Sequence, residues 1–190
     1  MAPILHTDRL TLTGHCIDDL EDLAAMWAEP AVYSMIGGVA RSREEVWIRL
    51  LRSIGQWQAF GYGSWVLRDA TGAFVGEIGL IEARRAIDPP LTAPEVGWTL
   101  SPAAHGQGYA SEALAAILDW TDAKGITATV CIIDPDNAPS LRLASRVGYL
   151  VKQEGTYREK PILILERASR SPSETGARSG AFDRLVAPPH

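Results

Sequence analysis

Between residues 95 and 133 the sequence places one amphipathic helix between two strand-like segments, the pattern of a β-α-β unit. The segment Glu95–Leu100 ends at a turn with two glycines, after which apolar residues recur at helical spacing over about 110–124. The second segment, Thr127–Ile133, is β-branched and almost continuously apolar, as in a strand covered on both faces. Two strands joined through one helix are expected to be parallel, with a right-handed crossover. The chain is therefore expected to build an α/β sheet.

Hydrophobic periodicity predicts the elements on either side of this unit. Alternation predicts five more strands, at Arg9–Thr13, Ser64–Arg68, Ala73–Ile81, Tyr149–Gln153 and Pro161–Glu166. Helices are predicted before Pro30, from the capping pair Ser42 and Glu45, and over Ser140–Arg146. The second of these helices is expected to bury a stripe made of Trp47, Leu50, Leu51 and Ile54. The segment Ala83–Ala93, rich in proline and charge, is expected to be an exposed loop.

The resulting order is one strand, two helices, three strands, a helix, a strand, a helix and two strands. We expect a single α/β (α+β) domain with a mixed central sheet of about seven strands. The length of 190 residues suits one such domain, which we assign to residues 1–167. Residues 168–190 are rich in Ser, Arg, Gly and Pro and are expected to form a mobile tail.

Composition excludes several classes of function. The net charge of -5 argues against a nucleic-acid partner, and no apolar run approaches the roughly 20 residues that span a bilayer. Cys16 and Cys131 stand far apart, so neither a disulfide framework nor a zinc site is indicated. The N-terminus lacks the layout of a secretory signal, and we expect a cytoplasmic protein.

The glycine-rich turn is the segment that carries chemistry. Backbone N–H groups in a row can converge there at the positive end of a helix dipole, which makes an anion site suited to a phosphate or pyrophosphate. These N–H groups belong to Gly106, Gln107, Gly108, Tyr109 and Ala110.

Two nucleotide-binding motifs fit this turn poorly. A P-loop needs a lysine directly after its last glycine, whereas the next lysine here is Lys124. A dinucleotide-binding turn needs a third glycine or alanine, and Ser111 occupies that position.

The chain resembles the GNAT N-acetyltransferase superfamily, in particular its ribosomal-protein alanine and serine N-terminal acetyltransferase branch. The resemblance runs from Thr7 to about Arg167. The family signature [QR]-x-x-G-x-[GA] appears as His105-Gly106-Gln107-Gly108-Tyr109-Ala110, with His in the first position. Two further pieces match, Glu95-Val96-Gly97-Trp98 and the run Asp136–Ser140 leading to Arg146–Tyr149.

The resemblance implies that the two parallel strands splay apart and that acetyl-CoA lies in the gap, with no metal required. It implies a pantetheine arm bonded to the first strand, a pyrophosphate on the glycine turn and an oxyanion donor near Leu100. The residues expected to bind the coenzyme are Trp98, Thr99, Leu100, His105, Gly106, Gln107, Gly108, Tyr109, Ala110, Ser111 and Asn137.

Transfer to an amine requires a proton acceptor and a group that stabilises the departing thiolate. The resemblance makes Glu95 the candidate base and Ser140 the candidate donor to sulfur, with Tyr149 and Tyr157 as further donors. Glu95 could instead be solvated or paired across strands. Asn137 and Ser140 could simply cap a helix.

We therefore expect an acetyl-CoA-dependent N-acetyltransferase that transfers directly to a primary amine, either a protein N-terminus or a small molecule. The connection after Gly155, Thr156-Tyr157-Arg158-Glu159-Lys160, is shorter than is usual in the branch that the chain resembles, which favours an open cleft that accepts a peptide end. An aminoglycoside or polyamine acetyltransferase is the alternative, and would draw an acidic cleft from Asp69, Glu77, Glu82 and Glu95. A second alternative is a non-catalytic acyl-CoA-binding module. The resemblance also allows a homodimer.

Overall fold

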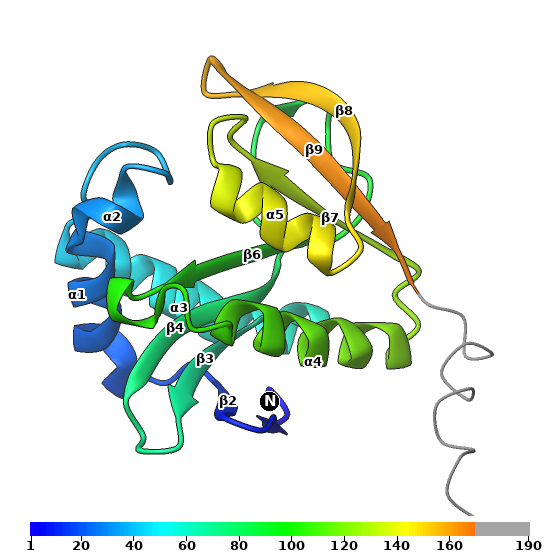
Figure 1. The fold of residues 1–190 in the computed structure, drawn as a ribbon. Coiled ribbons are helices and arrows are strands. Elements are labelled where there is room, and N and C mark those ends of the chain that lie inside the picture. The colour runs from blue at the N-terminus through cyan, green and yellow to red at the C-terminus, as the bar shows by residue number, and fades with distance from the viewer. Residues whose placement is uncertain (170–190) are drawn as a thin grey trace, which may run out of the picture.

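The computed structural model describes residues 1–169 and contains one nine-stranded sheet in the order β1-β2-β3-β4-β6-β7-β9-β8-β5. The strands are β1 (Leu5–His6), β2 (Leu10–Gly14), β3 (Ser64–Asp69), β4 (Phe74–Ile81), β5 (Ile87–Asp88), β6 (Glu95–Leu100), β7 (Ala128–Ile133), β8 (Leu150–Tyr157) and β9 (Lys160–Ala168). The helices are α1 (Leu20–Ala28), α2 (Pro30–Tyr33), α3 (Arg43–Phe60), α4 (Tyr109–Ala123) and α5 (Ala138–Arg146), with short 3-10 turns η1 (Ile17–Asp19) and η2 (Pro102–Ala104). Figure 1 shows their arrangement.

The predicted α/β class and the order of the longer elements are confirmed, and the sheet has two more strands than the seven expected. Both additions, β1 and β5, are two residues long. A one-turn helix, α2, also begins at Pro30, since proline is well suited to the first turn of a helix. Pro30 thus follows the end of one helix and starts another.

The prediction of an exposed loop over residues 83–93 is wrong in its middle. Ile87 is buried and pairs with Tyr157 at the free edge of β8, and it packs against Ile162 and Ile164. Two residues of alternation are too few to show as a strand in the sequence.

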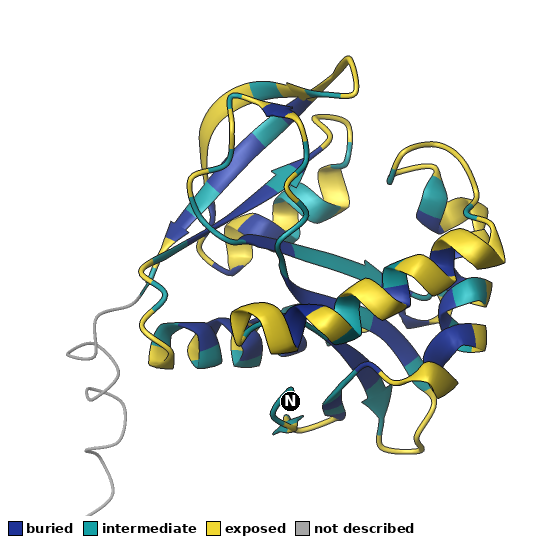
Figure 2. Cartoon of the chain, turned by 180° about the vertical axis from the view of Figure 1, so that it is seen from behind, coloured by how far each residue is buried: buried dark blue, intermediate teal, exposed yellow. Residues whose placement is uncertain are grey.

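The sheet half made of β2, β3, β4 and β6 is covered on both faces, by α4 on one and by α1 and α3 on the other (Figures 1 and 2). Ile78 and Trp98 lie opposite each other on adjacent strands and face α4. Glu77 and Thr99 are the next such pair and therefore face the α1 and α3 side, because successive side chains alternate between faces.

The buried face of α3 is displaced from the predicted stripe. Leu50 is buried as expected, but Trp47 is 36% exposed and Leu51 46% exposed. Val46 and Trp57 are buried in their place. Both sets of residues fit a helical period, so the periodicity did not distinguish two neighbouring stripes.

β6 and β7 are parallel and share one registered pair, Glu95 with Val130. Beyond that pair the two strands diverge. β6 stays paired with β4 as far as Leu100, whereas β7 pairs with β9 along its whole length. The predicted splay is therefore present, and Figure 1 shows the two strands separating.

β9 extends to Ala168, one residue past the predicted end of the domain at residue 167, and the Ser169 N–H donates to the Thr127 carbonyl at 2.9 Å. The rest of the predicted tail, residues 170–190, lies outside the described residues. Within residues 1–169 no helix is long and apolar enough to cross a membrane, and no three His, Cys, Asp or Glu side chains are grouped to hold a metal ion.

Candidate active site

The turn between β6 and α4 presents unbonded backbone donors. Gly106 and Gly108 have φ of +75° and +83°, a region that side chains disfavour, and Gly108 caps α4 without a side chain. Within residues 1–169, the amides from Gly106 to Ser111 have no hydrogen-bond acceptor, and the first bonded amide is Glu112, which donates to the Gly108 carbonyl at 3.1 Å. Six successive N–H groups at a helix N-terminus suit an anion such as a diphosphate.

Arg9, the residue directly before β2, holds this turn in place. Its guanidinium donates to the Gln107 carbonyl at 2.9 Å and to Glu112 at 2.7 Å, and its Cζ atom lies 4.6 Å from the centre of the Tyr109 ring. Thr7 donates to the other oxygen of Glu112 at 2.6 Å. The sequence placed Thr7 at the start of the resemblance, but the link to a residue more than a hundred positions away had no local signal.

The two polar side chains of the turn are directed back onto its own backbone. His105 Nε2 lies 3.1 Å from the Leu100 carbonyl oxygen, and Gln107 donates to the Ala103 carbonyl at 2.7 Å. The turn therefore offers a ligand its main chain more than these two side chains.

Trp98 and Ser140 are brought together from opposite sides of the splay. The indole N–H of Trp98 donates to Ser140 Oγ at 3.2 Å. Because an indole nitrogen can only donate, the Ser140 oxygen accepts, which leaves the hydroxyl hydrogen for another acceptor. Asn137 accepts from the Ser140 N–H at 3.1 Å and is the N-cap of α5, so its capping role is present.

Glu95 lies where β6 and β7 last pair, and its side chain is only 8% exposed. It forms a hydrogen-bonded ion pair with Arg85, which comes from the connection between β4 and β6. The structure thus places Glu95 at the closed end of the splay but gives it a cationic partner that the sequence did not reveal.

Another largely enclosed carboxylate, Glu77, was not among the predicted catalytic residues, and its side chain is 14% exposed. It accepts from the Trp27 indole at 3.2 Å, lies 3.0 Å from His15 Nε2 and sits beside Thr99 in register. Burial alone would raise the pKa of Glu77, but the hydrogen bond and charge of His15 and the charge of Arg49 lower it to about 2. Glu77 is therefore a firmly ionised, structural carboxylate near neutral pH.

The two further tyrosines have different surroundings. Tyr149 is buried, its hydroxyl lies 2.7 Å from Thr129 Oγ1, and burial raises its pKa. Tyr157 lies at the end of β8, where the guanidinium groups of Arg85 and Arg158 stack on its ring.

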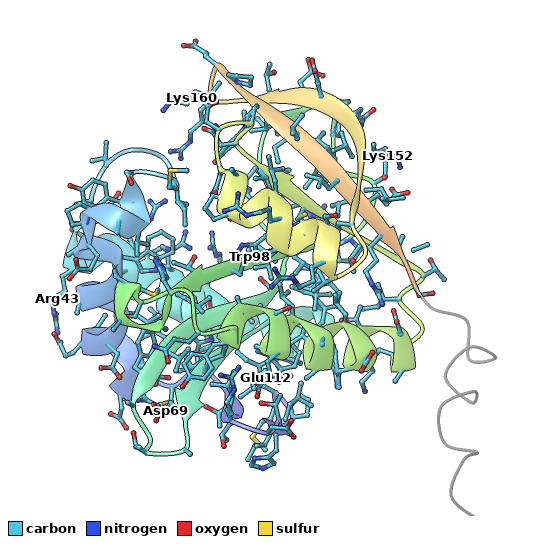
Figure 3. The ribbon with its side chains drawn as sticks, in the orientation of Figure 1. Arg43, Asp69, Trp98, Glu112, Lys152 and Lys160 are labelled. Atoms are coloured by element: carbon cyan, nitrogen blue, oxygen red, sulfur yellow. The ribbon has the colours of Figure 1, made fainter. Side chains whose placement is uncertain are left out.

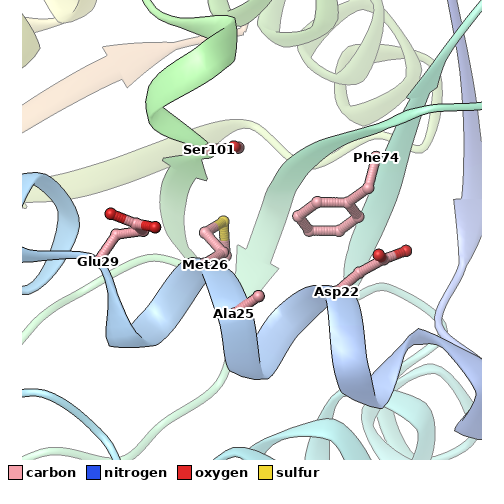
Figure 4. A pocket seen from close by; sticks show the side chains of 6 residues that line it. All are labelled: Asp22, Ala25, Met26, Glu29, Phe74 and Ser101. Carbon is pink, nitrogen blue, oxygen red and sulfur yellow. The ribbon is translucent and has the colours of Figure 1, made fainter.

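A small hollow opens between α1 and the far end of β6, lined by Asp22, Ala25, Met26, Glu29, Phe74 and Ser101 (Figure 4). Asp22 is held by Arg68 at 2.9 Å, and Glu29 supplies the other charge. Two carboxylates make this hollow unfavourable for a phosphate, in contrast to the unbonded amides of the glycine turn.

Comparisons of the sequence and of the structure with known proteins point to the same family. The family model described as "Acetyltransferase (GNAT) domain" matches residues 9–150. The uncharacterised protein YkkB of Bacillus subtilis is 27% identical over 171 residues, which is 87% of this chain and 95% of that protein.

Solved structures agree. A protein of Bordetella pertussis assigned to the GNAT family of acetyltransferases is 32% identical, has a TM-score of 0.79, and covers 88% of this chain and 100% of its own. The ribosomal L7/L12 acetyltransferase RimL in complex with coenzyme A shares the fold at 19% identity, with a TM-score of 0.72 and coverage of 87% and 98%.

The splayed parallel strands, the unbonded amides of the glycine turn and the match over residues 9–150 lead to one assignment. The chain belongs to the GNAT family and is an acetyltransferase.

Proposed function

We propose that this acetyltransferase takes its acetyl group from acetyl-CoA and transfers it directly to a primary amine. The observation that carries the proposal is the row of six unbonded amides at the end of a strand that has parted from its parallel neighbour. The diphosphate of coenzyme A would accept from these amides, the residues from Gly106 to Ser111. A relative of the same fold, RimL, is solved with coenzyme A bound, which supports this donor.

The pantetheine arm would lie along the open edge of β6. Trp98, Thr99 and Leu100 pair with β4 on one edge, and the other edge faces the gap left by β7. Backbone groups on that edge can bond to the two amides of the arm, and Asn137 stands across the gap at the start of α5. An N–H near Leu100 would then donate to the thioester carbonyl as negative charge develops there.

The reaction forms one C–N bond and breaks one C–S bond. The amine attacks the thioester carbonyl, its extra proton passes to a base, and the sulfur leaves as a thiolate that is then protonated. We assign the base to Glu95, acting directly or through water, with Arg85 as the residue that positions it. We assign stabilisation of the thiolate to Ser140, whose hydroxyl hydrogen is not used by Trp98.

The aminoglycoside or polyamine alternative needs carboxylates that are free to meet a cationic acceptor, and each of the four candidates already has donors of its own. Asp69 is the last residue of β3, at the edge of the molecule (Figure 3), and accepts from Thr71 in the turn that follows. Glu82 accepts from Tyr62 and Arg84, while the largely enclosed Glu77 and the buried Glu95 lie beside arginines.

Release of free coenzyme A thiol tests the proposal. Acetyl-CoA and the full chain are mixed with a panel of primary amines, and the thiol is followed with a colorimetric reagent while mass spectrometry follows the amine. Amine-dependent thiol release with a matching 1:1 acetylated product is expected. Tight binding of acetyl-CoA with no amine-dependent release from any member of the panel would instead favour the non-catalytic binding module.

A further inference from the structure

Arginine side chains from four separate segments gather on the sheet face opposite α4. They come from the segment after α2, from α3, from the connection between β4 and β6, and from the β8–β9 turn. The residues are Arg41, Arg49, Arg52, Arg85 and Arg158, which we call the arginine cluster.

Two aromatic rings hold four of these guanidinium groups. The Cζ atoms of Arg41 and Arg49 lie 5.0 and 4.4 Å from the centre of the Trp27 ring. Those of Arg85 and Arg158 lie 5.2 and 5.3 Å from the centre of the Tyr157 ring. Stacking of this kind holds a cation in place without neutralising it.

The two groups lie on adjoining parts of the fold, because the loop that leads to Arg41 approaches the β8–β9 hairpin that carries Arg158, and their charges also interact. Burial lowers the pKa of Arg41, Arg49 and Arg85, and the charge of Arg49 further lowers that of Arg41 and Arg85. The charge of Arg158 likewise lowers the pKa of Arg41. The charge of Arg52 lowers the pKa of both Arg49 and Arg85.

Carboxylates neutralise only part of this charge. Glu77 lies 3.8 Å from Arg49, Glu95 pairs with Arg85, and Glu45 acts on Arg41 from a greater distance. Within residues 1–169, Arg41, Arg52 and Arg158 make no salt bridge.

Three guanidinium N–H donors of the cluster have no hydrogen-bond acceptor among residues 1–169. The Nε atoms of Arg41, Arg49 and Arg85 are buried and have no hydrogen-bond partner within residues 1–169. Buried polar atoms are nearly always bonded, so three such atoms in one cluster indicate an acceptor that binds there.

The cluster is separate from the coenzyme turn. Arg85 joins β6 at Glu95, and the glycine turn follows Leu100 at the other end of that strand, about 17 Å away at 3.3 Å per residue. At the other end of this face the loop carrying Gly38 approaches Lys160, the first residue of β9 (Figure 3): a Cβ at Gly38 would lie 3.9 Å from Lys160 Nζ. Only Arg158 and Glu159 separate β8 from β9 there.

From this geometry we propose that the acceptor is a primary amine that carries carboxylate groups, such as a peptide N-terminus followed by acidic residues. The inference rests on the proposed function and names its substrate class. The carboxylates would bond to the arginine cluster and hold the amine near Glu95. A polycationic acceptor would be repelled by the same side chains.

The test compares acceptors that differ only in charge. Full-length protein and acetyl-CoA are given the tripeptide amides Ala-Glu-Glu, Ala-Gln-Gln and Ala-Lys-Lys, and, in a second arm, free glutamate and glutamine. If the acceptor is a peptide, Ala-Glu-Glu is expected to have a kcat/KM about tenfold or more above that of Ala-Gln-Gln. If it is a free amino acid, glutamate is expected to exceed glutamine by a similar factor. In either case the advantage should shrink as salt is added. An equal or higher kcat/KM for the lysine peptide, or for the uncharged member of both arms, would overturn the inference and leave the proposed function standing.

Charge reversal gives a second readout. Arg158→Glu is expected to lower kcat/KM for the acidic acceptor and raise it for Ala-Lys-Lys, with the Kd for coenzyme A unchanged. Arg43→Gln, which removes an exposed arginine at the start of α3 that is paired with Glu21, is the control and should leave the acidic preference intact. A weaker Kd for coenzyme A in Arg158→Glu, with no change in acceptor preference, would assign the cluster to the coenzyme and contradict the inference. Absence of turnover with every amine would contradict the proposed function and this inference together.

Discussion

The indole N–H of Trp98 on β6 donates to the hydroxyl oxygen of Ser140 on α5 at 3.2 Å. This contact links the strand on one side of the splay to the helix that follows the strand on the other. It orients the serine hydroxyl, and its remaining hydrogen is free to be donated toward a sulfur atom in the gap.

Ser140→Ala is expected to lower kcat by about tenfold to a hundredfold, with a smaller effect on the KM for the amine, because the thiolate loses a donor. Steady-state kinetics with acetyl-CoA measure this. Ser145→Ala, which changes an exposed serine of the same helix, is the matched control. Equal kcat values for both variants would remove Ser140 from the chemistry.

Glu95→Gln is expected to leave the Kd for coenzyme A unchanged and to lower kcat, because the amine loses its proton acceptor. The loss should diminish at high pH, where more of the amine is already deprotonated. A pH–rate profile checks this, with Glu154→Gln on the exposed side of β8 as control. A profile that keeps the wild-type shape and height would contradict the assignment of Glu95 as base.

Gly108→Glu is expected to abolish coenzyme A binding, because a carboxylate would stand among the amides that bind the diphosphate. The variant also places a side chain at a φ of +83°. Gly72→Glu is the matched control, since Gly72 has a φ of +85° in the β3–β4 turn. Isothermal titration should show binding lost in the first variant and kept in the second; comparable binding in both would show that the turn does not hold the diphosphate.

Glu77 makes the fold sensitive to acid. Its pKa is about 2 in the folded protein against an ordinary 4.5, so its contribution is complete above about pH 5 and is lost as pH falls toward 2. The size of the shift corresponds to about 3 kcal/mol, shared with His15 and Arg49. Denaturant unfolding at several pH values should show a shallower decline between pH 5 and 2 for Glu77→Gln than for the wild type. Parallel declines would show that Glu77 is not the group responsible.

The fold could largely be predicted because the residues that favour each strand or helix also indicate how neighbouring elements pair. The β-branched run at Thr127–Ile133 and the glycines before α4 each specify their own backbone and together specify a parallel pair. The wrong predictions fall where a strand is too short to show alternation, or where two stripes of one helix fit the same period. Ile87 belongs to a two-residue strand, and the periodicity of α3 fits both the exposed Trp47 and the buried Val46.

The glycine turn, which we propose holds the coenzyme, could be predicted because it is built from contiguous backbone. The arginine cluster, which we propose binds the acceptor, could not, since Arg41, Arg85 and Arg158 come from segments distant in the sequence and have no common motif. The ion pair between Arg85 and Glu95 likewise follows from how the β4–β6 connection folds back, which no spacing in the sequence reveals.

Thermal unfolding of the full chain with coenzyme A, acetyl-CoA, ATP or NAD most directly tests whether the turn after Leu100 holds a coenzyme A diphosphate. At 100 times its Kd, a ligand that binds only the folded state adds about 2.7 kcal/mol, which raises the Tm of a chain of this size by about 5–10 °C. We predict that shift for coenzyme A and acetyl-CoA and little change with the other two. A shift with ATP or NAD and none with either form of coenzyme A would contradict the account.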